Sequence, residues 1–482
     1  MNEVSQSGSK RNGIFAVLLA GCIVCSFVQT ALNVALVPIM VQMHITASVA
    51  QWLTSSYSLV MGIMVLATAF LIRRFPARPL FLVDMAIFMA GLLLSATAGN
   101  FAILLIGRLL QAVGCGILLS LTQVVVLTIY PSGKRGSVMG IFGLAVTAAP
   151  VLSPTLAGVL IDRYNWQMIF WISLVIAVVV TAAGLVVLEN TTKTEKQRFD
   201  LLSMILCSIG FSGLLLGAGQ FGSYPLLDYR VWLPIIIGLA ASVIFVIRQL
   251  AIEKPLIELR IFKNHEFRVA VLASMILYGV MIAGSVLIPI YSQSLRSFSA
   301  TQTGLITLPG SLATAIGSLI AGRLYDRIGM QKLSLGGSVL LLLGSAGLIL
   351  LDNNTTMVMM IVYFIVRQAG MGFLMMPIYT WGISKLPQKH YSDGTALLGS
   401  LRTVAGAMGA AALVAVMTAV SGMQNQQNQY LGVRVSFIVM AVLALILMMV
   451  SIFLIGQRPL LLTPDSSTDS VPSGDLNKPD KP

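Results

Sequence analysis

Three arginines lie inside long apolar stretches of this 482-residue sequence, namely Arg108, Arg367 and Arg402. A charge at the centre of a membrane costs about 2.5 kcal/mol or more unless it faces a cavity or a partner. Gln111 falls about one helical turn after Arg108, on the same face, where its amide can hold the guanidinium. Arg108 is therefore a candidate for handling charge, and the alternative is a structural arginine that bonds backbone carbonyls of a neighbouring helix.

Asp84 is the acidic residue closest to the interior of an apolar stretch. A carboxyl group in that position can bind and release a proton. A local salt bridge with Arg73, Arg74 or Arg78 is the competing interpretation.

A neutral polar stripe runs along the first apolar stretch. Its members follow at i, i+4, i+7 and i+11, a spacing that places them on one face of a helix: Cys22, Ser26, Gln29 and Asn33. We expect this face to look into a cavity rather than lipid, where it contacts either a substrate or a neighbouring helix.

Residues for enzymatic chemistry are not assembled in this sequence. The histidines, His44, His265 and His390, lie in separate expected loops, and no acid pair, metal cluster or phosphate-binding glycine loop is present. Cys22 and Cys25 match a redox spacing but lack its strand-loop-helix context, so we expect buried structural thiols. The sequence thus predicts no enzyme, no cofactor and no metal site. Any movement of a solute across the membrane must then be driven by an ion gradient or by the solute's own gradient.

The composition predicts an all-α polytopic membrane protein. The chain is 57% hydrophobic and 10% charged, with a mean hydropathy of +0.91, far from the values of soluble domains. We count about fourteen apolar stretches of roughly 20 residues, each long enough to cross a bilayer.

The basic residues set the expected topology. Most of the 30 lysines and arginines lie at the chain ends and in alternate short loops, which the positive-inside rule places in the cytoplasm together with both termini. The net charge of +13 is then explained by topology and by attraction to membrane lipids. We expect no nucleic-acid partner.

An internal repeat indicates two parallel halves. Gly114-Cys-Gly116 precedes Pro131 at the same distance as Gly370-Met-Gly372 precedes Pro387, which is typical of transporters built from related bundles. The expected divisions are a cytoplasmic N-terminus at 1–12, a six-helix bundle at 13–190, two inserted helices at 200–251, a second six-helix bundle at 267–457 and a disordered cytoplasmic tail at 458–482.

Several motifs in order resemble one known family. They include LNVAL in the first span, GRLLQAVGCG, APVLSPTLAGVLIDRYNWQMIF, AGRLYDRIG and LRTVAGAMGAA. Over nearly its whole length the chain resembles the major facilitator superfamily, within it the fourteen-spanner drug/proton antiporters (EmrB/QacA type). The resemblance implies the major facilitator fold, proton antiport, and a role for Arg108 in coupling. It also places a family aspartate at the position of Val28, so this chain lacks that acid.

Gating and cavity residues are expected partly from this resemblance and partly from helical spacing. Pro150, Pro154 and Gly158 stand in the family's exporter motif, which implies a seal and hinge, although small residues that simply pack are the alternative. Asp326 and Arg327 lie in an expected tight cytoplasmic loop, where they can latch during rocking. The expected substrate cavity comprises Ser26, Gln29, Asn33, Tyr57, Tyr363, Arg367 and Met371. The last three share one helix face by their spacing, and a face that packs in the core or against lipid is the alternative for them.

Three functions remain open at this point. The first is a bacterial cell-membrane exporter of small amphipathic compounds or drugs, coupled to protons. The second is a dedicated exporter of an endogenous anionic or lipid-like metabolite, and the third is a membrane sensor that transports nothing. The oligomeric state is left open.

Overall fold

The structure is a computed structural model that describes residues 8–130, 132–189, 200–221, 224, 228–252, 257–352, 355–387, 390–421 and 426–455. The expected tail at 458–482 lies outside these residues. Within the described part, 14 helices are long and apolar enough to cross a membrane, and no strand occurs. This confirms the predicted fold class, since helices satisfy their own backbone hydrogen bonds in lipid.

The N-terminal half is a bundle in which α1 packs against α5, α6 and α7, while α4 packs against both α5 and α7. Polar caps set several helix starts, as where Asn100 accepts a hydrogen bond from the Ile103 N–H at the start of α5. The bounds are α1 (Gly8–Met43), α2 (Ala47–Ala50), α3 (Trp52–Arg74), α4 (Ala77–Ala96), α5 (Phe101–Ile129), α6 (Ser132–Arg163) and α7 (Gln167–Val187).

The C-terminal half repeats this pattern, with α10 packed against α12, α13 and α14. The bounds are η1 (Leu259–Lys263), α10 (His265–Ile290), η2 (Tyr291–Leu295), α11 (Ala300–Ile349), α12 (Met357–Ser384), α13 (Tyr391–Ser421) and α14 (Gln426–Phe453). The long α11 holds two spans, and the chain turns between them at Gly329, whose φ of 77° favours glycine.

The hairpin of α8 (Leu201–Gln220) and α9 (Tyr229–Ala251) separates the halves in sequence. In space α8 packs against α3 of one half and α13 of the other, so it covers the line where they meet. Asp200 holds the hairpin by accepting from Arg248 at 3.0 Å. Burial alone would raise the pKa of Asp200, but the hydrogen bonds from Ser203 and Arg248 hold it below its usual range. We propose the divisions at 13–190, 200–251 and 267–457 as the domain organisation.

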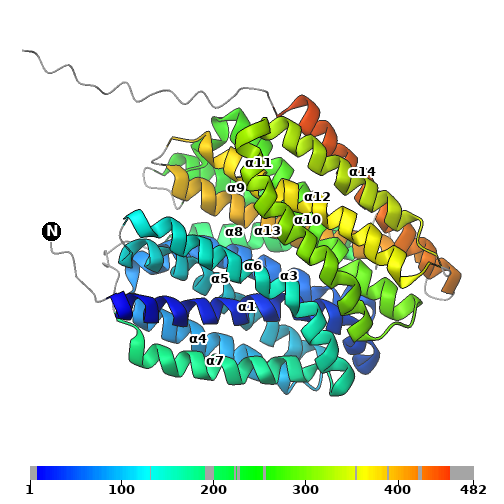
Figure 1. The fold of residues 1–482 in the computed structure, drawn as a ribbon, viewed down its shortest axis with the longest axis horizontal. Helices are drawn as coiled ribbons and strands as arrows, with labels where there is room; N and C mark the ends of the chain where they lie inside the picture. The colour runs from blue at the N-terminus through cyan, green and yellow to red at the C-terminus, as the bar shows by residue number, and fades with distance from the viewer. Residues whose placement is uncertain are drawn as a thin grey trace, which may run out of the picture.

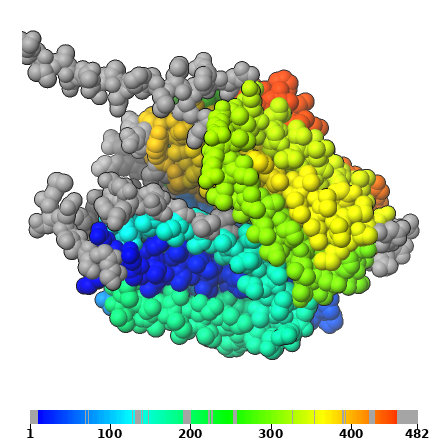
Figure 2. All heavy atoms as spheres, in the orientation of Figure 1, coloured from blue at the N-terminus to red at the C-terminus, as the bar shows by residue number. Residues whose placement is uncertain are grey.

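The two halves meet at one end and separate at the other. Their contacts run through α1 with α10, α3 with α13, and α6 with α11. Figure 1 shows the halves converging where α6 ends and α11 begins, and diverging where α1 begins. We call these the closed end and the open end. In Figure 2 the surface recedes between the halves at the open end, with α13 (orange) visible behind.

Candidate functional site

Arg108 is the centre of a buried polar cluster in the N-terminal half. Its side chain is 0% exposed, and its Nη1 donates to Gln111 Oε1 at 2.8 Å. Gln111 in turn donates from Nε2 to the Gly91 carbonyl of α4 at 2.9 Å. The ring of Tyr57 lies 4.1 Å from Arg108 Cζ, a cation–π distance. The structure therefore shows Arg108 and Gln111 in the contact that their spacing predicts, and adds Tyr57, which the sequence assigned separately to the cavity.

The same arginine reaches two backbone carbonyls on other helices. Nη1 donates to the Val28 carbonyl of α1 and Nε to the Leu53 carbonyl of α3, each at 3.4 Å. Arg108 Nη2 has no hydrogen-bond partner. Val28 is the position at which the resembled family carries an aspartate, so a carbonyl accepts where a carboxylate is absent. The geometry supports the structural role, and one nitrogen of the guanidinium stays buried without a partner.

Asp84 does not form the local salt bridge that the sequence offers as an alternative. It is 1% exposed, and neither carboxyl oxygen has a hydrogen-bond partner. Arg78, one of the expected partners, instead donates to the Leu185 carbonyl at 2.7 Å. The salt-bridge interpretation is therefore wrong, because α4 turns Asp84 into the bundle and away from the arginines at its end.

Three thiols lie near Asp84. Cys22, Cys25 and Cys115 lie close to its carboxyl group or to one another, and Cys115 also lies close to Tyr57. Cys22 Sγ lies 3.2 Å from Thr122 Oγ1. The polar interior of this half thus extends from Asp84 through the thiols and Tyr57 to Arg108.

All four cysteines, including Cys207, are free and buried, as the sequence predicts. We expect a membrane-impermeant maleimide to leave them unmodified in the native protein and to label them after denaturation in sodium dodecyl sulfate. Intact-mass measurement checks this. Labelling of the native protein would contradict the burial.

The polar stripe of α1 divides between two neighbours. Cys22 faces α5, Ser26 is buried, and Gln29 is half-buried. Asn33 Nδ2 donates to Ser285 Oγ of α10 at 3.2 Å, so it contacts the other half of the molecule. Interhelical hydrogen bonding, one of the two predicted roles, is what Asn33 performs in this conformation.

The expected aromatic and methionine face on α12 packs into the C-terminal half. Arg367 is 1% exposed, and its Nη2 donates to the Val280 carbonyl of α10 at 2.6 Å. Tyr363 lies against Gly347 of α11, and Met371 is 1% exposed. Arg367 and Met371 therefore do not line an open cavity in this conformation, because the small residues of α11 let the helices pack closely over them.

Arg402 of α13 is held differently. Its Cζ lies 4.6 Å from the ring centre of Tyr278 on α10 and 5.0 Å from that of Tyr379 on α12. Its side chain is half-buried. The sequence marked Arg402 as an intramembrane charge without giving it a role, and Tyr278 was missed altogether.

The first seam between the halves joins α6 to α11. A Cβ at Gly158 would stand 2.5 Å from the Ala300 carbonyl oxygen, and one at Gly304 would stand 2.6 Å from that of Pro154. The carboxylate of Asp162 accepts from the backbone N–H groups of Ala300 at 3.2 Å and Thr301 at 2.8 Å. Asp162 thus caps α11 from the opposite half, a role that sequence reasoning missed.

The expected gating prolines lie in α6. Pro154 takes part in this seam, while Pro150 is half-buried one turn earlier. Arg327 is exposed and lies where the two spans of α11 join, two residues before the turn at Gly329. The side chain of Asp326 lies outside the described residues.

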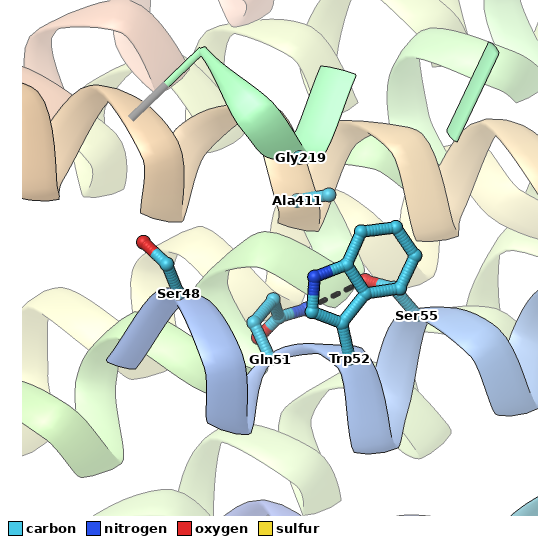
Figure 3. A pocket seen from close by; sticks show the side chains of 6 residues that line it. All are labelled: Ser48, Gln51, Trp52, Ser55, Gly219 and Ala411. Carbon is cyan, nitrogen blue, oxygen red and sulfur yellow. Dashed lines mark hydrogen bonds between the residues drawn. The ribbon is translucent and has the colours of Figure 1, made fainter. Parts of the chain in front are cut away.

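The second seam joins α3 to α13. Ser55 Oγ donates to the Ala407 carbonyl at 3.1 Å, and Ser400 Oγ donates to the Gly62 carbonyl at 3.0 Å. Figure 3 shows a small cavity at its end, where the indole of Trp52 lies beside Gly219 of α8 and Gln51 donates to Ser55. An apolar cluster that includes Leu59, Ile63 and Val404 fills the rest of the seam.

Comparison with known proteins settles the family. A family model described as "Major Facilitator Superfamily" matches residues 18–410. The chain belongs to the major facilitator superfamily. It is similar to the uncharacterized MFS-type transporter YcnB of Bacillus subtilis, with 37% identity over 95% of this chain and 98% of that protein. It is also similar to the lincomycin resistance protein LmrB of the same organism, with 37% identity over 84% of this chain and 85% of that protein.

Solved structures support the same fold. A peptide transporter POT in complex with sulfate aligns with a TM-score of 0.69 at 14% identity, covering 92% of this chain and 96% of that one. A bacterial homologue of the human lysosomal transporter Spinster aligns with a TM-score of 0.67 at 14% identity, covering 92% of this chain and 97% of that one. The chain is an integral membrane transporter rather than an enzyme, as the sequence predicts.

Proposed function

We propose that this protein exports small amphipathic compounds from the cytoplasm by proton antiport with alternating access. The observation that carries the proposal is the asymmetry of the halves, which meet along two seams at the closed end and separate at the open end. A transporter that is open on one side only can bind a substrate from that side. The halves then rock and expose the substrate to the other side. By the positive-inside rule, the loop charges favour a cytoplasmic location for the open end. The export direction rests on the similarity to a relative named for drug resistance.

Proton coupling rests on Asp84 and Arg108. An ionised carboxylate without a partner is costly in the membrane interior, whereas a protonated carboxyl group is tolerated. Asp84 is thus suited to carry a proton in this conformation and to release it when the halves rearrange. Arg108, with its unpartnered Nη2, supplies a fixed positive charge in the same polar interior.

An accumulation assay tests the proposal. Expressed in bacteria that lack their own efflux pumps, the protein should lower the accumulation of at least one dye or antibiotic severalfold. The panel includes lincomycin, because a relative is named for resistance to it. A protonophore should restore accumulation. If no compound in a broad panel responds, the multidrug form of the proposal is wrong.

A dedicated exporter of an anionic or lipid-like metabolite is the second candidate. Three arginines within spans, Arg108, Arg367 and Arg402, outweigh Asp84, the carboxylate buried among them, and this balance suits an anion better than a cation. Resistance to anionic or neutral compounds, but not to lipophilic cations, would favour it. Purified protein that binds ligand in liposomes and never moves it would instead identify the sensor considered above.

A further inference from the structure

We propose that Arg402, Tyr278 and Tyr379 form a binding site for an anionic group, such as a carboxylate, phosphate or sulfonate, carried on a largely apolar molecule. The proposal deepens the proposed function, because it names the chemistry that the transporter recognises. It rests on the contacts, exposure and placement of these three residues.

Arg402 has binding capacity that the protein does not use. Its Nε is buried in this conformation and has no hydrogen-bond partner, and among the ion pairs of the described residues none includes Arg402. Arg108 and Arg367 each have one unpartnered nitrogen as well, but both also donate to a backbone carbonyl of another helix. Arg402 is therefore the intramembrane arginine whose charge is left for something else to neutralise.

The two tyrosines hold the guanidinium without satisfying its donors. They contact it at 4.6 Å and 5.0 Å from the ring centres, and such contacts stabilise the cation through the ring faces. The N–H groups lie at the edge of the guanidinium plane, in a fork that matches carboxylate and phosphate oxygens. The rings themselves offer apolar surface to the rest of the ligand.

The site faces the space between the halves. Arg402 lies within the span Asp393–Ser421 yet is half-buried rather than sealed, and a partly exposed cation is too costly to face hydrocarbon. Tyr278 precedes Ser285 by two helical turns, so both lie on one face of α10. Because Ser285 bonds Asn33 of α1, that face looks toward the N-terminal half.

The site therefore lies on the inner side of the C-terminal half, whose α13 packs against α3 of the N-terminal half. A substrate that enters from the open end reaches Arg402 before it reaches the contact between Asn33 and Ser285. A phospholipid headgroup carries the same chemistry as an anionic substrate, and the experiment below separates the two sources.

Binding of two matched dyes tests the site. Fluorescein is anionic at pH 7.4, and rhodamine 123 is a cation on the same ring skeleton. We expect purified protein in phosphatidylcholine nanodiscs to bind fluorescein, measured by fluorescence anisotropy, and Arg402→Gln to weaken that binding at least tenfold. Arg402→Lys should fall between, because it keeps the charge and loses the fork. Rhodamine 123 binding should not weaken in either variant.

The matched control is Arg434→Gln, which removes an exposed arginine from α14 and should leave both dyes unaffected. Phosphatidylglycerol in the nanodiscs identifies the source: if it competes with fluorescein in the wild type but not in Arg402→Gln, the site holds a lipid headgroup. If it does not compete, the site holds the transported anion. Both results support the anion site.

Equal fluorescein affinity in the wild type and Arg402→Gln would overturn the proposal. So would a wild type that binds fluorescein in neither lipid. These binding measurements need no gradient and no transport, so their outcome is independent of the export proposal. The protein can bind the anion without exporting it, and it can export compounds with Arg402 replaced.

Discussion

Asp84→Asn is expected to abolish transport driven by a pH gradient while leaving substrate exchange intact. Asparagine has nearly the shape of a protonated aspartate, so the packing around α4 persists, but it cannot release a proton. Exchange of labelled for unlabelled substrate requires rocking alone, whereas net transport against a gradient requires the proton cycle. We expect gradient-driven uptake into inverted vesicles to fall at least tenfold, and exchange to change by less than about twofold, equivalent to roughly 0.4 kcal/mol.

The control for this variant is Asp84→Glu, which restores a titratable group and should recover part of the driven transport. The melting temperature of each purified variant shows whether it folds. Full gradient-driven transport by Asp84→Asn would show that the proton is carried elsewhere.

Gly158→Val is expected to produce the second large effect, because it blocks the closed end. Its Cβ would stand 2.5 Å from the Ala300 carbonyl oxygen and 2.9 Å from Thr301 Cα, distances that close-packed backbone cannot accommodate. Overpacking of this kind costs about 1–3 kcal/mol, and here the halves relieve it by moving apart. The variant should therefore populate states open at this end and lose most of its transport.

Distance measurement between spin labels on α6 and α11 checks this expectation, with a longer distance in Gly158→Val than in the wild type. Gly143→Val, also in α6, is the matched control, since a Cβ added there meets no atom within 4 Å beyond the neighbouring residues of its own helix. Unchanged distances together with full transport would mean that the seam at Gly158 does not open during the cycle.

The local sequence pattern was sufficient to predict the membrane spans and one contact between two polar side chains. Span number follows from the length of apolar stretches, and the contact between Arg108 and Gln111 follows from their helical spacing. The contact of Arg108 with Val28 does not, because it depends on how α1 and α5 approach each other.

The contacts between the halves were the hardest to foresee. Asp162 caps α11 across 138 residues of sequence, and its spacing within its own helix carries no sign of that partner. The burial of Asp84 was likewise decided by the rotation of α4, and a position near the end of a span favoured the wrong salt bridge. Such errors arise because sequence periodicity determines only which residues share a helix face. Which neighbouring helix that face contacts depends on how the helices pack.

The central claim is that substrate movement and proton movement are coupled. The direct measurement is proton flux in liposomes that contain the purified protein and a pH-sensitive dye, after addition of a compound that the accumulation assay has identified. The account predicts a substrate-dependent proton flux in the wild type that Asp84→Asn and Arg108→Ala both abolish. Substrate movement without proton flux, or full coupled flux in both variants, would contradict it.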